Sequence, residues 1–374
     1  MNLSYKKLSE VCEILDSRRI PITASERRAG PYPYYGANGI QDYVDNFIFD
    51  DELVLLAEDG GNFGSKDRPI AYRVSGKCWV NNHAHVLKPL SEIDVDYLCY
   101  SLMFYDTSKF VNGATRQKLT QAAMRQMSIP IRSLSEQKEI VCKIKSLGNI
   151  MALRKSQLKK LDCLASSRFI EMFGDPVKNP KGWEIHSLSD YIEFLTSGSR
   201  GWSQYFSDTG AYFITIKNVK GGKIIFDDVQ FVSPPNNAEA VRTKIQEGDL
   251  LISITADLGR TAVVSREVAE YGGYINQHLS CIRLNRNYLE PFFVANFLES
   301  DAGKRQFAAK NQNAVKAGLN FNSIRSLRIP VPPLSLQRDF IAFIEELDKS
   351  KVTIQKSLDR LNLLYKALLQ EYFG

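Results

Sequence analysis

Apolar residues recur every three or four positions over two long stretches of the chain, residues 135–174 and 335–374. The first stretch is interrupted by Arg154 and Arg168 and the second by Lys351. Such a spacing, kept over about five heptads, is typical of the seam of a coiled coil. We therefore predict two long helices that pack against each other. The predicted seam positions are Ile144, Leu147, Leu158, Leu161, Ile344, Leu347, Leu358 and Leu361.

The second stretch repeats the first at a constant offset of 200 residues. Matched positions begin at Ile129 and Ile329 and continue to the end of each stretch. Each copy opens with a short apolar run that contains a proline, which predicts a strand, and a serine follows at the expected start of the helix. A serine side chain can cap the first free amides of a helix. The expected capping residues are Ser135 and Ser335.

The repeat also predicts how the domains are organised. Residues 175–334 must leave the end of the first helix and return to the start of the second, and the ends of a compact domain usually lie close together. We therefore expect the helices to run antiparallel, with a globular domain at each end and a pseudo-twofold axis between them. The expected domains are residues 1–134 and 175–334, separated by helices at 135–174 and 335–374.

The two globular segments share an order of predicted elements, which indicates one mixed α/β (α+β) fold used twice. Residues 52–58 and 78–89 have the β-branched and aromatic character of strands, and residues 248–254 match the first of them. The triplets Asn-Asn-His at 81–83 and Asn-Gln-His at 276–278 recur at equivalent places. They predict a polar network at a strand end, which we interpret as structural, with contact to a ligand as the alternative.

Composition and charge limit the class of protein. The 374 residues are 44% apolar, enough for two or three domains with cores, and the formal charge is +6. Because the first helical stretch contributes +4 of this charge and the second none, about +2 remains for the two globular segments. A nucleic-acid surface must then be a local patch. No signal peptide or membrane span is predicted, and the six scattered cysteines are typical of a cytosolic protein without a zinc site.

The chain lacks the motifs of the enzymes that commonly act on DNA. It has neither the cofactor-binding turn nor the Asn/Asp-Pro-Pro-aromatic motif of a methyltransferase, and residues 60–66 only resemble a phosphate-binding loop. Glu136-Gln137-Lys138 has the ending of a nuclease motif, but the other copy reads Leu336-Gln337-Arg338. An acid in the first turn of a helix is favoured by the helix dipole. We predict no catalytic residue and no metal ligand.

The paired openings of the form Ile-Pro-[Ile/Val]-x-x-Leu-Ser-x-Gln, each preceded by an α/β segment and followed by a helix of about forty residues, resemble the specificity subunit of type I restriction-modification systems. The resemblance covers the whole chain. The sequence departs slightly from the family pattern at two places. Residues 131–133 lack the prolines found at 331–333, and Leu336 replaces the usual acidic residue before Gln337. The resemblance implies two target recognition domains, each reading half of a bipartite double-stranded DNA sequence, held apart by the helices across an unread spacer.

The resemblance also implies the partners of the chain. Two modification subunits, which use S-adenosylmethionine, would dock on it. Two restriction subunits, motor-nucleases that use ATP and magnesium, would join where the system includes them. No cofactor is expected in this chain, which would act in the prokaryotic cytoplasm away from membranes. The alternative is a repeat-built scaffold that does not bind DNA.

Basic and amide side chains on loops are the expected DNA contacts, because basic groups anchor phosphates and amides can reach base edges. In the first domain these residues are Asn62, Lys66, Arg68, Arg116, Gln117 and Lys118. In the second they are Arg200, Lys217, Asn218, Lys220, Lys316 and Asn320.

Overall fold

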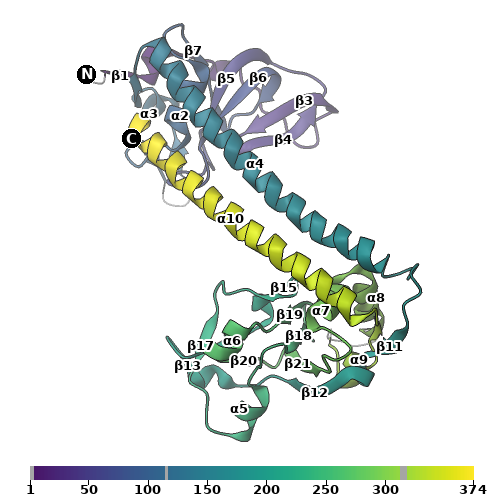
Figure 1. The fold of residues 1–374 in the computed structure, drawn as a ribbon. Helices are drawn as coiled ribbons and strands as arrows, with labels where there is room; N and C mark the ends of the chain where they lie inside the picture. The colour runs from purple at the N-terminus through teal and green to yellow at the C-terminus, as the bar shows by residue number, and fades with distance from the viewer. Residues whose placement is uncertain (1–3, 114–116, 312–317) are drawn as a thin grey trace. The chain divides into compact units, whose positions relative to one another are not determined.

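The computed structural model describes residues 4–113, 117–311 and 318–374 (Figure 1). The chain divides into two compact units, of which unit 1 comprises Met1–Gln157 with Ile354–Gly374 and unit 2 comprises Leu158–Thr353. Each unit contains one globular domain, part of one long helix and the complementary part of the other. The units therefore divide within the helices. Unit 1 is completed by the helical segment Ile354–Gly374 from the far end of the sequence, whereas unit 2 is continuous in sequence.

Unit 1 is built on a six-stranded sheet with the strand order β2-β7-β5-β6-β3-β4, and strand β1 pairs separately with β10. The strands are β1 (Ser4–Lys7), β2 (Cys12–Ile14), β3 (Ala29–Gly36), β4 (Gly39–Val44), β5 (Phe49–Ala57), β6 (Ala71–Val80), β7 (Ala84–Pro89), β8 (Val111–Asn112), β9 (Lys118–Leu119) and β10 (Ser128–Ile131). The helices of its globular domain are α1 (Leu8–Val11), η1 (Asp16–Arg18), α2 (Val95–Met103) and α3 (Gln121–Met124).

Strand β5 lies at the centre of the sheet and is buried on both faces. Val54 and Leu56 point into the core beneath α2, whereas Leu53 and Leu55 point into a second core on the opposite face. Side chains alternate between the faces of a strand, so a strand covered on both sides reads as a continuous apolar run. This arrangement explains the unbroken hydrophobic sequence over residues 53–57.

Unit 2 contains two four-stranded sheets, with the orders β12-β21-β18-β19 and β13-β17-β14-β20. Its strands are β11 (Ile185–Ser187), β12 (Ile192–Ser197), β13 (Phe206–Ser207), β14 (Ala211–Ile214), β15 (Val219–Lys220), β16 (Lys223–Ile224), β17 (Gln230–Val232), β18 (Leu250–Ser253), β19 (Thr261–Val263), β20 (Gly273–Ile275), β21 (Leu279–Leu284) and β22 (Arg328–Pro330). Its helices are η2 (Leu188–Tyr191), η3 (Trp202–Tyr205), η4 (Ile216–Asn218), α5 (Ala238–Thr243), α6 (Arg266–Tyr271), α7 (Pro291–Glu299), α8 (Asp301–Lys310) and α9 (Phe321–Arg325).

The two domains share one topology. The order β12-β21-β18-β19 in unit 2 repeats β2-β7-β5-β6 in unit 1, and β14 runs parallel to β20 as β3 runs parallel to β6. The long strand β6 corresponds to β19 and β20 together, because α6 interrupts the second copy between them. The prediction of one mixed α/β fold used twice is confirmed.

Both predicted long helices are present, as α4 (Leu134–Phe173) and α10 (Leu334–Phe373). In unit 1 the beginning of α4 and the end of α10 share a core that includes Ile144 and Leu369. In unit 2 the end of α4 and the beginning of α10 share a second core that includes Phe169 and Phe340. Within each unit the segments therefore pack antiparallel. Of the predicted seam residues, Ile144, Ile344, Leu347 and Leu358 are buried, and Leu147, Leu158, Leu161 and Leu361 are half-buried.

The predicted caps of the long helices, Ser135 and Ser335, are wrong. Helix α4 starts one residue before Ser135, and Ser133 caps it by accepting a hydrogen bond from the amide of Glu136 at 3.3 Å. The Glu136 carboxylate accepts in return from the hydroxyl and amide of Ser133, which lowers the pKa of Glu136. This reciprocal pair is a capping box. In the second copy Pro333 occupies the position of Ser133, and a proline side chain has no oxygen that could cap α10.

A buried glutamine explains why the openings of the two repeats are alike. In unit 1 the side chain of Gln137 accepts from the amide of Asp94 at 2.7 Å and donates to the carbonyls of Glu92 and Arg132 at 3.0 and 2.9 Å. Because Asp94 is the N-cap of α2, Gln137 joins the start of α4 to the start of α2.

Gln337 makes the equivalent bonds in unit 2. It accepts from the amide of Glu290 at 2.9 Å and donates to the carbonyls of Tyr288 and Pro332 at 2.9 and 2.8 Å. Glu290 is the N-cap of α7, the counterpart of α2. Each glutamine is fully buried with three hydrogen bonds, so it fixes the same junction between helices in both domains.

The last aromatic residue of each long helix is part of the core of one domain. Phe173, at the end of α4, packs in unit 2 against Phe293 of α7 and Phe340 of α10, with ring centroids 4.7 and 5.6 Å away. Phe373, at the end of α10, packs in unit 1 against Tyr97 of α2 at 5.0 Å. Each domain therefore needs the end of the helix that belongs to the other copy of the repeat.

Candidate nucleic-acid interface

Three loops meet at one end of the central sheet in unit 1. The amide of Glu58, which follows β5, donates to the carbonyl of His83 in the β6–β7 turn at 2.9 Å. The amide of Leu119 in β9 donates to the carbonyl of Glu58 at 2.7 Å. A hydrogen bond between the His83 ring and the Asp59 carboxylate ties the turn to the same place. This strand end gathers the loops that carry the predicted DNA contacts of the first domain.

The same arrangement recurs in unit 2. The amide of Ile254, which follows β18, donates to the carbonyl of His278 at 2.9 Å, and the amide of Leu319 donates to the carbonyl of Ile254 at 2.8 Å. The ring of His278 hydrogen-bonds the hydroxyl of Thr255 at 2.7 Å. Thr255 occupies the position that Asp59 holds in unit 1. The backbone hydrogen bonds that join these loops, which we call the strand-end scaffold, are therefore the same in both units, while the side chains on the loops differ.

The recurring triplets form the turns at these two strand ends. Asn81 accepts from the amide of His83 at 2.8 Å, and Asn276 accepts from the amide of His278 at 3.2 Å. An asparagine that accepts from the amide two residues later stabilises a tight turn. The predicted polar network is therefore present at both strand ends, and its asparagines and histidines hold the backbone of the turn.

A buried network supports the strand end in unit 1. The ring of His85 bonds the Asp16 carboxylate at 2.6 Å and the carbonyl of Leu119 at 2.8 Å, and Gln121 donates to Asp16 at 3.0 Å. Burial raises the pKa of Asp16, but hydrogen bonds from His85, the Val86 amide and Gln121 more than offset it, so the pKa is lowered overall. The network holds β9, which includes Lys118, against the sheet, and with it the adjoining Gln117.

Asp16, Glu58 and His85 bring three ligand-type atoms within 4.8 Å of one another. Protein cations already occupy the surroundings of this cluster, because Arg19 lies 2.6 Å from one Glu58 oxygen and Lys118 lies 3.1 Å from the other. The arrangement therefore fits an ion-pair network and not a metal site. This network could not be predicted from the sequence, because Asp16, Glu58 and His85 are far apart along the chain.

The described DNA candidates of the first domain lie on the loops at this strand end. Lys66 and Arg68 are exposed, and neither forms an ion pair with any residue in the described ranges. Asn62 is half-buried and donates to Asn38 at 3.1 Å. Gln117 is exposed beside Lys118, whose ammonium group pairs with Glu58. The remaining candidate, Arg116, lies outside the described residues.

The second domain distributes its candidates over more than one loop. Arg200 is exposed at the strand end, where it donates to the side chain of Gln277. Lys217 is exposed in η4, and Lys220 is exposed at the end of β15 in the β15–β16 hairpin. Asn320 is exposed but serves as the N-cap of α9, accepting from the amide of Ser323 at 2.8 Å. The candidate Lys316 lies outside the described residues.

The prediction that Asn218 is an exposed DNA contact is wrong. Its side chain is 1% exposed, accepts from the amide of Thr215 at 3.0 Å and donates to the carbonyl of Ile225 at 3.0 Å. Asparagine in a loop commonly bonds to nearby backbone in this way. Asn218 therefore holds a turn closed and cannot reach a base.

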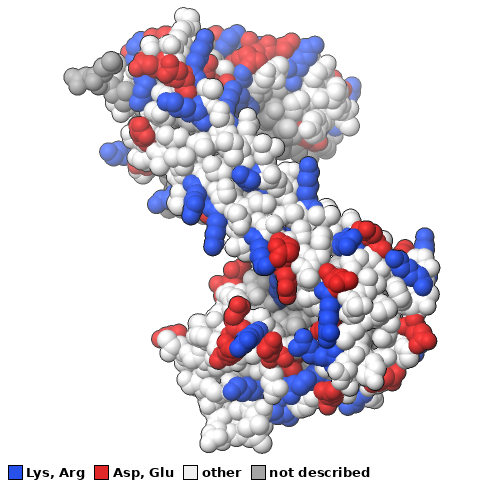
Figure 2. All heavy atoms as spheres, viewed as in Figure 1, with Lys and Arg blue, Asp and Glu red and all other residues white. Residues whose placement is uncertain are grey.

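Charge is mixed over the face shown in Figure 2, where Lys and Arg lie among Asp and Glu on both units. This distribution agrees with the expectation that any DNA surface is a local patch. Among the described residues, no helix is long and apolar enough to cross a membrane.

Comparison with known proteins identifies the family. The family model of the type I restriction modification DNA specificity domain matches residues 2–162 and 180–363. A protein of Haemophilus influenzae named as a type I restriction enzyme specificity subunit is 27% identical, over 95% of this chain and 90% of that protein. The EcoKI specificity subunit of Escherichia coli is 22% identical, over 86% of this chain and 74% of its own length.

Solved structures show the same fold. The crystal structure of a type I restriction-modification system S subunit from M. genitalium superimposes with a TM-score of 0.60 at 15% identity, covering 100% of this chain and 96% of that one. A chain from a structural study of complex assembly in the type I restriction-modification system gives a TM-score of 0.60 at 18% identity, covering 99% and 97%. The chain thus belongs to the family of type I restriction modification DNA specificity domains, as its sequence repeats indicated.

Proposed function

We propose that the chain selects the DNA site of a type I restriction-modification complex, with each domain reading one half of a bipartite double-stranded sequence. The observation that carries this proposal is the strand-end scaffold that occurs once in each domain with different side chains on it. A repeated scaffold can approach DNA in the same way twice, and different side chains then read different bases. A spacer that neither domain reads would separate the two half-sites.

The exposed side chains at the strand ends suit this task. Lys66, Arg68 and Arg200 supply cations for phosphates, and Gln117 supplies an amide for a base edge. A cation without a carboxylate partner is available to a phosphate, and binding releases the counterions of DNA. The modest charge of the domains is consistent with a few such contacts placed by loops.

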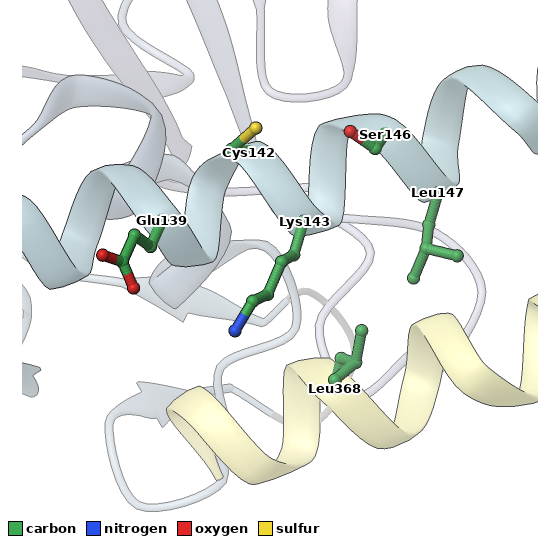
Figure 3. A pocket seen from close by; sticks show the side chains of 6 residues that line it. All are labelled: Glu139, Cys142, Lys143, Ser146, Leu147 and Leu368. Atoms are coloured by element: carbon green, nitrogen blue, oxygen red, sulfur yellow. The ribbon is translucent and has the colours of Figure 1, made fainter.

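The long helices offer a surface for protein partners. In unit 1 an open groove of about 630 Å³ lies between α4 and α10 (Figure 3). It is lined by Glu139, Cys142, Lys143, Ser146, Leu147 and Leu368. Nearby helix positions expose large apolar side chains, with Leu153 65% and Leu363 70% exposed. Exposed apolar side chains along a helix are typical of a surface that another helix covers, and we propose that two modification subunits dock on α4 and α10.

The chain itself is the non-catalytic specificity component. We propose that S-adenosylmethionine is bound by the modification subunits and that ATP and magnesium are bound by two motor-nuclease subunits in systems that restrict DNA. The complex would act in the prokaryotic cytoplasm, where its DNA lies. The alternative function is a scaffold protein that does not bind DNA. It predicts that the complex with modification subunits has no preference for any DNA sequence.

The salt dependence of DNA binding tests the proposed phosphate contacts. The substitution Lys66→Ala, in the complex with modification subunits, is expected to weaken binding equally for all target sequences. It should also reduce the slope of log affinity against log salt concentration by about 0.9, because one phosphate contact is lost. Fluorescence anisotropy over a range of salt concentrations measures both quantities.

Lys77→Ala is the matched control. Lys77 is also exposed, but it lies on β6 opposite Asp50, near the start of β5 and away from the strand end that carries Asp59. We expect its slope to equal that of the unaltered complex. Equal slopes for Lys66→Ala and the unaltered complex would show that Lys66 does not contact a phosphate. An unaltered complex that binds DNA without sequence preference would support the alternative function, a scaffold protein that does not read DNA.

A further inference from the structure

Asn82 and Gln277 occupy one structural position in two different domains. Each is the middle residue of a turn, between β6 and β7 in unit 1 and between β20 and β21 in unit 2. In each turn the preceding asparagine accepts from the amide of the following histidine. The backbone is therefore held in the same way, while the middle side chain is free to differ.

The following histidine ties each turn to the neighbouring strand end. His83 bonds Asp59 after β5, and His278 bonds Thr255 after β18. The backbone at each position is thus supported from both sides. A side chain on a fixed backbone can be placed against a base edge with little loss of conformational freedom, which favours selective binding.

The two amides have hydrogen-bonding capacity left for a ligand. The side chain of Asn82 is exposed and makes no hydrogen bond with another described residue. The amide oxygen of Gln277 accepts from Arg200, and its nitrogen lies 3.2 Å from the ring nitrogen Nε2 of His278. A carboxamide offers two acceptor lone pairs and two donor hydrogens. Gln277 therefore keeps one of each while its neighbours orient it.

Cations lie at both strand ends. In unit 1 the loop that follows β5 carries the exposed Lys66 and Arg68, and in unit 2 Arg200 contacts Gln277 directly. A cation next to an amide can bind a phosphate while the amide reaches into the groove, which is the usual division of roles in sequence-specific DNA binding. The two strand ends share this pair of functions although their side chains differ.

We propose that Asn82 and Gln277 are equivalent specificity-determining residues, each reading a base edge in one half-site. This proposal rests on the proposed function and deepens it. The carboxamide matches adenine in the major groove, accepting from the N6 amino group and donating to N7. Gln277 has one more methylene than Asn82 and is oriented by Arg200, so the two turns present the same chemical group at different reach.

The substitutions Asn82→Ala and Gln277→Ala test the proposal in the complex with modification subunits. Selection of bound duplexes from a library with randomised half-sites reports the preference at every base pair. Each variant is expected to lose discrimination about 10- to 100-fold at one base pair of one half-site, and the other half-site should be unchanged. The two variants should affect opposite half-sites.

Two exposed amides at the other end of the equivalent strands are matched controls. Asn46 precedes β5 and Gln246 precedes β18, so Asn46→Ala and Gln246→Ala remove the same groups away from the turns. Both controls should keep the full preference. Asn82→Gln, which keeps the amide and changes only its reach, should retain affinity for some sequence while altering the preference in the same half-site.

The outcomes separate the proposal from the proposed function. Weakening that is uniform over all sequences would show that Asn82 and Gln277 contact the DNA backbone, and this would overturn the proposal. An unchanged preference at every base pair would overturn it too. If the unaltered complex selects no sequence, the proposed function itself fails. Thermal unfolding of each variant shows whether it is still folded. If an alanine variant is not, the base preference of Asn82→Gln decides whether the proposal holds.

Discussion

Replacing Ile144 with aspartate is expected to destabilise unit 1 by about 4 kcal/mol or more. Ile144 is fully buried in the core that α4 and α10 form with the first domain. Truncating a buried isoleucine costs about 2–5 kcal/mol, and burying an unpaired carboxylate adds to that cost. Because the end of α10 belongs to the same core, the variant should release that segment as well.

Denaturant unfolding followed by circular dichroism measures this loss. Asn149→Asp is the matched control, because it places an aspartate on an exposed position of the same helix. It should change the free energy of unfolding by no more than about 0.5 kcal/mol. A similar stability for the Ile144 variant and its control would mean that the two helices do not share a core in unit 1.

Replacing Gln337 with methionine is expected to destabilise unit 2 by about 3 kcal/mol or more. Methionine has nearly the same length, so the substitution removes hydrogen bonds with little change in volume. The amide of Glu290 and the carbonyls of Tyr288 and Pro332 would then lose their side-chain partner. Each buried polar group left without a partner costs about 1–3 kcal/mol.

The exposed Gln355 on the same helix provides the control, as Gln355→Met. Differential scanning calorimetry should show a large decrease in unfolding temperature for the Gln337 variant and almost none for the control. The equivalent substitution Gln137→Met should act in the same way on unit 1. A mild effect at both glutamines would show that these hydrogen bonds do not fix the junction between the helices.

The sequence was sufficient to predict the long helices and the repeat because both depend on periodicity. Every predicted seam residue is buried or half-buried. The mixed fold could also be predicted, since β5 and β18 read as apolar runs between polar turns. These features depend on residues that are close together in the sequence, so the local pattern of apolar and polar residues is enough to predict them.

Features that depend on distant residues could not be predicted. The network of Asp16, His85 and Gln121 joins three separate elements, and the role of Gln137 depends on the position of α2. The burial of Asn218 was missed because residue type alone does not show whether a loop closes on itself. The triplets at 81–83 and 276–278 did carry a usable signal, since they recur in both domains with a different middle residue.

Exchange of one domain tests the central claim most directly. Because unit 1 includes the end of α10, the exchanged part should comprise residues 1–133 together with 354–374, both taken from a relative with a different target. The chimera is assembled with modification subunits, and its methylated sites are mapped by sequencing of the modified DNA. Our account predicts that one half of the recognised sequence changes to that of the relative while the other half is kept. A change in both halves, or in neither, would contradict two independent DNA-reading domains.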